Sequence, residues 1–176
     1  MPQNQLRSAL RAHTADSHGR LDRAVGLFDA IVPYKAYLQH THVFRETMEA
    51  ELAGFDGWSI VSLSALANQD LADLDTPRLS ARPFSGDDDR HGYKLGMAYV
   101  LEGSGLGSRI LVKRAAELGF GPSFGARHLA MQTDDPTRWR GFLAVLDTVP
   151  EPQFDSVLAG AEQCFQFALS IYTESR

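Results

Sequence analysis

The sequence predicts an all-α fold, a single-domain bundle of about six or seven helices. Apolar residues recur every three to four positions along most of the chain, which is the spacing of one helix face, and no segment alternates strictly between apolar and polar residues. Proline and glycine divide this pattern into segments of ordinary helical length. A chain of 176 residues with 44% hydrophobic content can bury a sizeable core, so we expect one domain spanning residues 1–176.

Six stretches carry the helical pattern. Proline, which is favoured in the first turn of a helix, begins three of them. Gly54 and Gly57 follow the end of the second stretch, and Gly119 follows the fourth. The predicted helices are residues 5–24, 33–52, 62–74 and 90–118, then from Pro136 to near Pro150, and from Pro152 to Tyr172.

Composition and charge exclude several classes of partner. A net charge of -5 gives no basic excess to neutralise phosphates, so we expect no nucleic-acid partner. No apolar run approaches the ~18 residues that span a bilayer, and the N-terminus lacks the pattern of a signal peptide. The lone cysteine, Cys164, cannot form an internal disulfide and is expected to be a buried structural thiol. Together these features predict a cytoplasmic protein without a membrane segment.

Three glycines interrupt the helix predicted over residues 90–118. Gly103, Gly105 and Gly107 stand at every second position, and glycine inside a helix costs about 1 kcal/mol relative to alanine. Either another helix packs very close to this backbone or a flat ligand does, and the local sequence favours neither. A phosphate-binding loop is disfavoured, because no strand precedes the glycines and no Gly-Lys-Ser/Thr ending follows them.

The first predicted helix carries a candidate metal ligand. Thr14, His18 and Asp22 lie on successive turns, so the carboxylate of Asp22 is within reach of one ring nitrogen of His18. A carboxylate in that place fixes the tautomer of a metal-binding imidazole and raises its basicity. From spacing alone, a half-buried histidine with a local hydrogen bond is the more common outcome.

The other histidines show no comparable pattern. His13 and His128 are expected to be exposed, and His40 and His42, two residues apart, cannot share a helix face and are expected at the surface or the edge of the core. The chain contains no Glu-x-x-His sequence, which disfavours a di-iron carboxylate site.

Basic residues flank both candidate segments. Arg109, Lys113 and Arg114 follow the glycines within two turns, and Arg7 and Arg11 precede His18. They could hold carboxylates at one edge of a ligand, although a solvated basic face is the more common role of such residues.

Taken together, these segments resemble the bacterial, biliverdin-producing branch of the heme oxygenase family, of the bacteriophytochrome-associated type. The resemblance covers nearly the whole chain in order and spacing. Its segments are Leu6-Arg7, Thr14-x-x-x-His18-x-x-Leu21-Asp22, Tyr34-Lys35-x-Tyr37-Leu38, Glu49-x-Glu51-Leu52, Asp70-Leu71-x-x-Leu74, Ala98-Tyr99-Val100-Leu101-Glu102-Gly103-Ser104-x-Leu106-Gly107 and Trp139-x-x-Phe142.

The resemblance implies a heme oxygenase-like helical bundle with a heme site. His18 would be the proximal ligand to the heme iron, with Thr14 and Asp22 beside it. The helix around the glycines would be the distal helix, with Gly103, Ser104 and Gly107 as its catalytic segment. The resemblance also implies cations that hold the heme propionates. We expect Lys113 first, then Arg11 and Arg114.

The resemblance also implies the reaction. Family members degrade heme with dioxygen and an external electron donor to biliverdin, carbon monoxide and ferrous iron, so heme is both cofactor and substrate. A reductase or a ferredoxin would supply the electrons, and a bacteriophytochrome could receive the biliverdin.

Three positions depart from the family pattern. The distal segment Ser104-Gly105-Leu106 lacks the aspartate of mammalian-type members, Ser108-Arg109 stands where two small residues are more usual, and Glu162 replaces an expected basic residue near a propionate. These departures motivate an alternative, a heme-binding protein for storage or delivery without turnover. A helical interaction module whose glycines serve close packing is a third hypothesis.

Overall fold

The computed structural model describes residues 5–86 and 90–173, which form an all-helical fold. The elements are α1 (Gln5–His13), α2 (Ala15–Val25), α3 (Ile31–Glu51), α4 (Ser64–Asp73), α5 (His91–Glu117), α6 (Arg127–Thr133), α7 (Arg138–Leu146), the short 3-10 helix η2 (Glu151–Gln153) and α8 (Phe154–Tyr172). No β-strand occurs in these two ranges, so the all-α prediction is confirmed. Among the same residues, no helix has the length and apolar character needed to cross a bilayer.

The described helices number eight, one or two more than the sequence predicts. The stretch 5–24 is two helices, because the backbone leaves helical geometry at Thr14, where φ is -98° and ψ is 4°. Helix α6 was not predicted, since its seven residues are too few to show a periodic pattern. The remaining helices lie where proline, glycine and apolar spacing place them.

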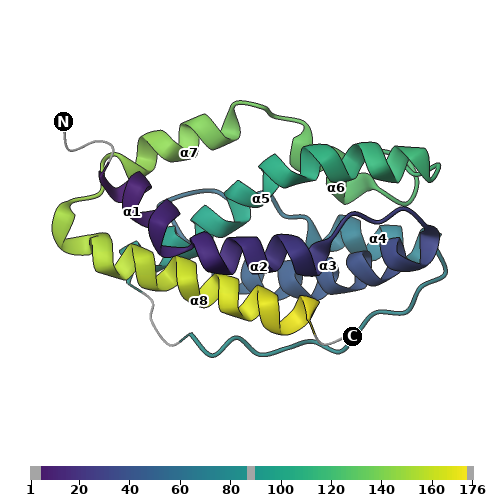
Figure 1. The fold of residues 1–176 in the computed structure, drawn as a ribbon, viewed down its shortest axis with the longest axis horizontal. Helices are drawn as coiled ribbons and strands as arrows, with labels where there is room; N and C mark the ends of the chain where they lie inside the picture. The colour runs from purple at the N-terminus through teal and green to yellow at the C-terminus, as the bar shows by residue number, and fades with distance from the viewer. Residues whose placement is uncertain (1–4, 87–89, 174–176) are drawn as a thin grey trace.

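Helices α5 and α8 cross in direct backbone contact. A Cβ atom added at Gly96 would lie 2.0 Å from the carbonyl oxygen of Val157, and one added at Gly160 would lie 2.0 Å from the carbonyl oxygen of Tyr93. Only glycine permits such an approach. From this crossing the two helices run apart toward their C-terminal ends (Figure 1).

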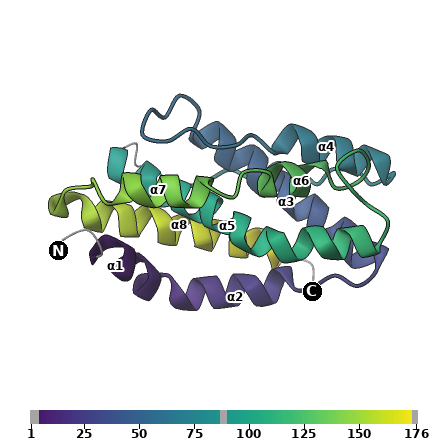
Figure 2. The same cartoon turned by 90° about the horizontal axis from the view of Figure 1, so that it is seen from above.

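The N-terminal helices cover one side of this pair. Helix α2 lies along α8, and α1 contacts both α8 and α7 (Figure 2). On the other side α3 packs on α4 and α8, while α6 joins α4 to α5. The main contacts of α2 are therefore with α8 and α1. Where α5 and α8 separate, α2 faces the C-terminal part of α5.

Three histidines lie deeper than the sequence predicts. His40, His42 and His128 are all buried, and His128 has no exposed surface, although it was expected at the surface. His13 is exposed as predicted. The prediction failed at His128 because it belongs to the unpredicted helix α6. There its ring is buried together with a hydrogen-bonded aspartate from α4.

That aspartate, Asp70, fixes the start of α6. Its carboxylate accepts hydrogen bonds from the backbone N–H groups of Arg127 and His128, each at 3.0 Å, and from the His128 ring Nδ1 at 2.8 Å. Arg127 donates to it as well, at 3.0 Å. Burial alone would raise the pKa of Asp70, but these hydrogen bonds outweigh burial and hold the pKa below its ordinary value.

The buried thiol was predicted correctly. Cys164 is fully buried with its Sγ 3.6 Å from the Sδ of Met48, and burial raises its pKa.

We expect the Asp70 carboxylate to contribute stability that depends on pH. Because its pKa is lowered by folding, the contribution is present above the ordinary value of 3.8 and is lost as the pH falls through the lower folded value. Asp70→Asn should lower the free energy of unfolding by about 2 kcal/mol at pH 7 and by less as the pH falls below 3.8. Urea unfolding across this pH range measures the difference.

The exposed Asp29, changed to asparagine, serves as the matched control and should leave stability unchanged. An equal loss for Asp70→Asn at every pH would show that charge is not the source of the contribution.

Candidate functional site

The site is organised around the start of α2, where the N-cap residue Thr14 lies near Tyr99 of α5. Thr14 is buried and donates its hydroxyl proton to the carbonyl oxygen of Leu10 at 2.8 Å. Burial raises the pKa of Tyr99, while the charge of Arg11 and the hydroxyl of Thr14 act in the opposite direction. From this point α2 and α5 run in the same direction (Figures 1 and 2).

The proximity of Thr14 and Tyr99 sets which residues of the two helices lie level. Each helix rises about 1.5 Å per residue. His18 is one turn beyond Thr14, and Gly103 is one turn beyond Tyr99, so these two lie at about the same level. Asp22 and Gly107 lie level one turn later by the same reasoning. The two segments that the sequence singled out thus lie level with each other on α2 and α5.

His18 presents a free ring nitrogen on α2. Its Nδ1 lies 3.1 Å from Oδ2 of Asp22, as the spacing predicts. A carboxylate at that distance favours the tautomer with the proton on Nδ1, which leaves the lone pair of Nε2 for a metal. The side chain is 61% exposed and rests edge-on against Phe165 of α8, with ring centroids 5.8 Å apart. The imidazole is therefore accessible to a ligand, and its inner edge packs against Phe165.

The three central glycines of α5 do not serve close helix packing within the described chain. A Cβ atom at Gly107 would meet nothing within 4 Å, and at Gly103 and Gly105 the nearest atoms would be 3.7 and 3.6 Å away, which is ordinary contact. This differs from Gly96, which does pack against another backbone. Of the two explanations for the glycines, the structure favours close approach by a ligand.

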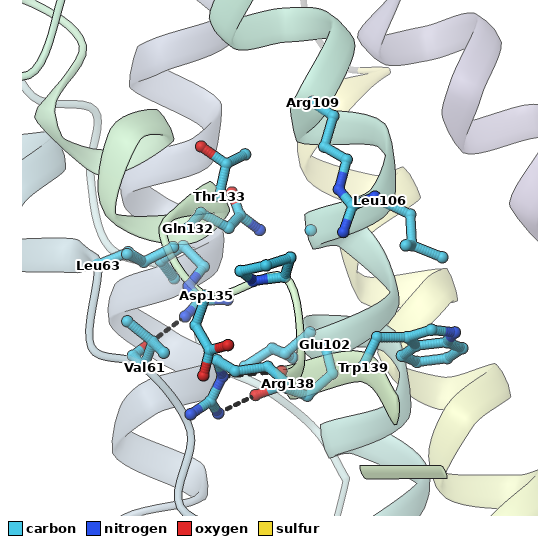
Figure 3. A pocket seen from close by; sticks show the side chains of 14 residues that line it. Val61, Leu63, Glu102, Leu106, Arg109, Gln132, Thr133, Asp135, Arg138 and Trp139 are labelled. Atoms are coloured by element: carbon cyan, nitrogen blue, oxygen red, sulfur yellow. Dashed lines mark hydrogen bonds and ion pairs between the residues drawn. The ribbon is translucent and has the colours of Figure 1, made fainter. Parts of the chain in front are cut away.

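Aromatic side chains border the glycine face on one side. Trp139 of α7 is the neighbour of Gly103, and its ring lies 5.6 Å from that of Tyr99. The adjacent Arg138 forms an ion pair with Glu102 (Figure 3). Glu102 also accepts a 2.8 Å hydrogen bond from the indole N–H of Trp58. Glu102 is thus engaged on the α7 side of α5 and does not replace the missing distal aspartate.

Ser104 and Ser108 turn toward α6, where they meet a residue that the sequence did not single out. Gln132 Nε2 donates to Oγ of Ser104 at 2.7 Å, and Ser108 donates its hydroxyl to Gln132 Oε1 at 2.8 Å. Gln132 was missed because it lies on the unpredicted helix. The available signal was the pair Ser104 and Ser108, two hydroxyls one turn apart on the same face of α5.

The predicted cations fall into two groups at opposite ends of the site. Arg11 lies near Tyr99, whereas Lys113 is about 21 Å further along α5 at 1.5 Å per residue. Arg114 forms an exposed ion pair with Glu117 at 3.1 Å. The structure does not bring Arg11 and Lys113 together, so one ligand edge cannot use both.

Glu162 is engaged by other residues of the chain. It lies on α8 beneath α2, where its carboxylate accepts hydrogen bonds of 2.6 Å from the hydroxyl of Ser17 and from the amide of Gln166. Its second oxygen is buried without a partner. The residue next to His18 is thereby fastened to α8, so Glu162 supports the proximal helix.

These features describe a site for a flat, metal-bearing ligand. One wall offers an imidazole nitrogen backed by a carboxylate, and the level region of the other wall is helix backbone with little side chain. The glycine face remains open to a planar group, and cations stand at both ends for acidic substituents. The residues present therefore fit heme.

Comparisons with known proteins agree with this geometry. The chain is 31% identical to the heme oxygenase PigA of Pseudomonas aeruginosa, and the alignment covers 93% of this chain and 89% of PigA. It is 27% identical to a heme oxygenase of Xanthomonas campestris over 65% of this chain and 72% of the relative. No protein-family model matches the chain.

A solved structure shows the same fold. The crystal structure of the NO- and CO-bound heme oxygenase from Neisseria meningitidis superposes with a TM-score of 0.75 at 24% sequence identity, and the match covers 96% of this chain and 90% of the other.

We expect two glycines on one helix to respond in opposite directions to alanine. Gly96→Ala should lower the free energy of unfolding by about 3 kcal/mol, because a backbone carbonyl cannot move aside as a side chain can. Gly107→Ala should raise it by roughly 0.5–1 kcal/mol through helix propensity alone. Urea unfolding of the ligand-free variants measures both. If Gly107→Ala were as destabilising as Gly96→Ala, the glycine face would not be open in solution.

Proposed function

Since the chain belongs to the heme oxygenase family, we propose that it binds heme between α2 and α5 and opens the macrocycle to biliverdin, carbon monoxide and ferrous iron. The observation that carries this proposal is the pairing of His18, backed by Asp22, with a helix face of bare glycine at the same level. As the substrate, heme supplies the iron at which dioxygen is activated, and electrons come from an external donor.

His18 would hold the heme iron through Nε2. A neutral imidazole is a weaker electron donor than a thiolate, so it would bind iron without strongly promoting O–O cleavage. Asp22 keeps the ring in the binding tautomer, and Phe165 limits how far the ring can tilt. The hydrogen bond from Ser17 to Glu162 holds the turn of α2 that carries His18 against α8.

The distal helix shapes the site through its lack of side chains at two glycines. Gly103 and Gly107 let the α5 backbone approach the porphyrin and leave room for small molecules on that face. Trp139 and Tyr99 cover one side and exclude bulk water there. No distal acid acts as a proton donor here, so protons arrive through water ordered against the backbone of the glycine turns.

The partners follow from the chemistry. The reaction needs reducing equivalents, and we propose a reductase or a ferredoxin as the donor. A bacteriophytochrome is the proposed acceptor of biliverdin. We place the single-domain protein in the cytoplasm, where its one buried thiol fits a reducing environment.

A turnover assay tests the proposed function. Purified protein with hemin, a reductant and air should lose the heme absorption band and gain that of biliverdin, with release of carbon monoxide. A heme spectrum that persists through repeated additions of reductant would show binding without turnover and would favour storage or delivery.

We expect His18→Ala to remove the axial ligand. The heme complex should then lose the absorption spectrum of an imidazole-ligated iron and its turnover, and added imidazole should restore part of both. His13→Ala, five residues earlier at the exposed end of α1, is the matched control and should behave as wild type. An unchanged spectrum in His18→Ala would reassign the proximal ligand.

We expect the propionates to lie at the Lys113 end of the site. Lys113→Met should weaken heme binding by up to about fivefold, which is the scale of one exposed ion pair, and the effect should shrink at high salt. Arg11→Met, at the opposite end, should change the affinity by less than about twofold. Heme dissociation rates measure both, and a larger effect at Arg11 would reverse the in-plane orientation.

A further inference from the structure

The central turns of α5 have low helix propensity and lack close backbone packing by another helix. Gly103, Gly105 and Gly107 give up about 3 kcal/mol of helix propensity within two turns, relative to alanine. No backbone of another helix packs against this stretch as α8 packs at Gly96. The geometry of these turns must therefore be fixed by something other than propensity or close packing.

Two serines beside the glycines provide the attachment points. Ser108 is buried, and its hydroxyl faces both the carbonyl oxygen of Ser104 at 3.0 Å and Oε1 of Gln132 at 2.8 Å. Ser104 donates its own proton to the carbonyl oxygen of Leu101 at 2.6 Å and accepts from Nε2 of Gln132. One amide thus uses its donor and its acceptor on hydroxyls one helical turn apart.

Gln132 reaches these serines from a firmly held element. It stands near the end of α6, whose first residues are bound by the buried Asp70 carboxylate. Figure 3 shows Gln132 extending from α6 toward α5, with Arg109 on the facing side of a small pocket between the two helices. The backbone oxygen of Gln132 is also the nearest atom to a Cβ built at Gly105, at 3.6 Å. The side chain therefore braces the face of α5 that is turned away from α2.

We propose that Gln132 is a positioning residue for the distal helix. Its amide holds Ser104 and Ser108 so that the glycine turns keep the backbone geometry that heme and dioxygen require. This inference rests on the proposed function for its catalytic consequence, but not for the brace itself. Gln132 also gives the buried Ser108 hydroxyl a side-chain acceptor on α6, in addition to the carbonyl oxygen of Ser104 within α5.

The direction of the two hydrogen bonds makes the inference specific. A glutamate at position 132 could still accept from Ser108, but its carboxylate could not donate to Ser104. The Ser104 hydroxyl would then have to release Leu101 and turn its proton toward α6. Leucine would remove both bonds at nearly the same volume. The two substitutions should therefore give graded effects.

Hydrogen exchange in the heme-free protein tests the brace. In Gln132→Leu, amides of residues 101–110 should exchange about tenfold faster than in wild type, and in Gln132→Glu about threefold faster. Amides of α3 should be unaffected in both. Gln69→Leu, the same change at an exposed α4 glutamine, is the matched control. Unchanged exchange in residues 101–110 of Gln132→Leu would overturn the proposal.

Coupling of electron use to product tests the positioning role. With the donor in excess, Gln132→Leu should yield several-fold less biliverdin per electron consumed, while heme affinity changes by less than about twofold. Faster exchange with unchanged coupling would show that Gln132 stabilises α5 without positioning it for chemistry, and would overturn the proposal. If wild type produced no biliverdin, the proposed function would fail, and the exchange result would still decide whether the brace exists.

If Gln132→Leu did not fold, Gln132→Glu would carry the test. This variant keeps the bond to Ser108 and nearly the full volume of the side chain. Faster exchange in residues 101–110 and reduced coupling in this variant support the proposal, and wild-type values for either contradict it.

Discussion

The backbone contact between α5 and α8 is the constraint on which the site depends. At Gly96 and Gly160 the two backbones are so close that a Cβ atom on either glycine would clash with a backbone carbonyl oxygen of the other helix. Such a crossing leaves no freedom to slide, because any side chain at either position would force the helices apart. It thereby fixes the angle at which α5 and α8 separate, and α2, which lies along α8, comes to face the C-terminal half of α5.

One face of α5 serves two purposes in succession. Gly92, Gly96, Gly103 and Gly107 are spaced four, seven and four residues apart, which keeps them within a narrow stripe of the helix. The first two lie against α8, and the last two lie beyond the divergence with no atom closer than ordinary contact. The same absence of side chains that brings two helices together thus leaves the next turns bare for a planar ligand. His18 reaches this region because the proximity of Thr14 and Tyr99 sets the level of α2.

The sequence predicted most of the helices and the partners of His18, since these depend on local spacing. An imidazole and a carboxylate four residues apart must meet on any regular helix, as His18 and Asp22 do. What it could not predict depends on contacts between distant segments. The glycines read the same whether a helix or a ligand lies over them, and only the neighbours of Gly96 and Gly107 separate the two cases. Helix α6 was missed for a related reason, because Asp70, 57 residues earlier, helps define its first turn.

Glu162 and Ser108, two of the positions noted as departures from the family pattern, have a similar structural role. Glu162 cannot attract a propionate, yet through Ser17 it holds the helix that carries His18. The Ser108 hydroxyl points away from α2, and its hydrogen bond to Gln132 ties α5 to α6. In each case a polar residue beside the site is used to fix a wall instead of contacting the ligand. A distal wall without an acid depends more on backbone geometry than one with a carboxylate does, because water must then be ordered by groups that cannot adjust individually. The rigidity that we propose Gln132 supplies is the property that such a wall needs.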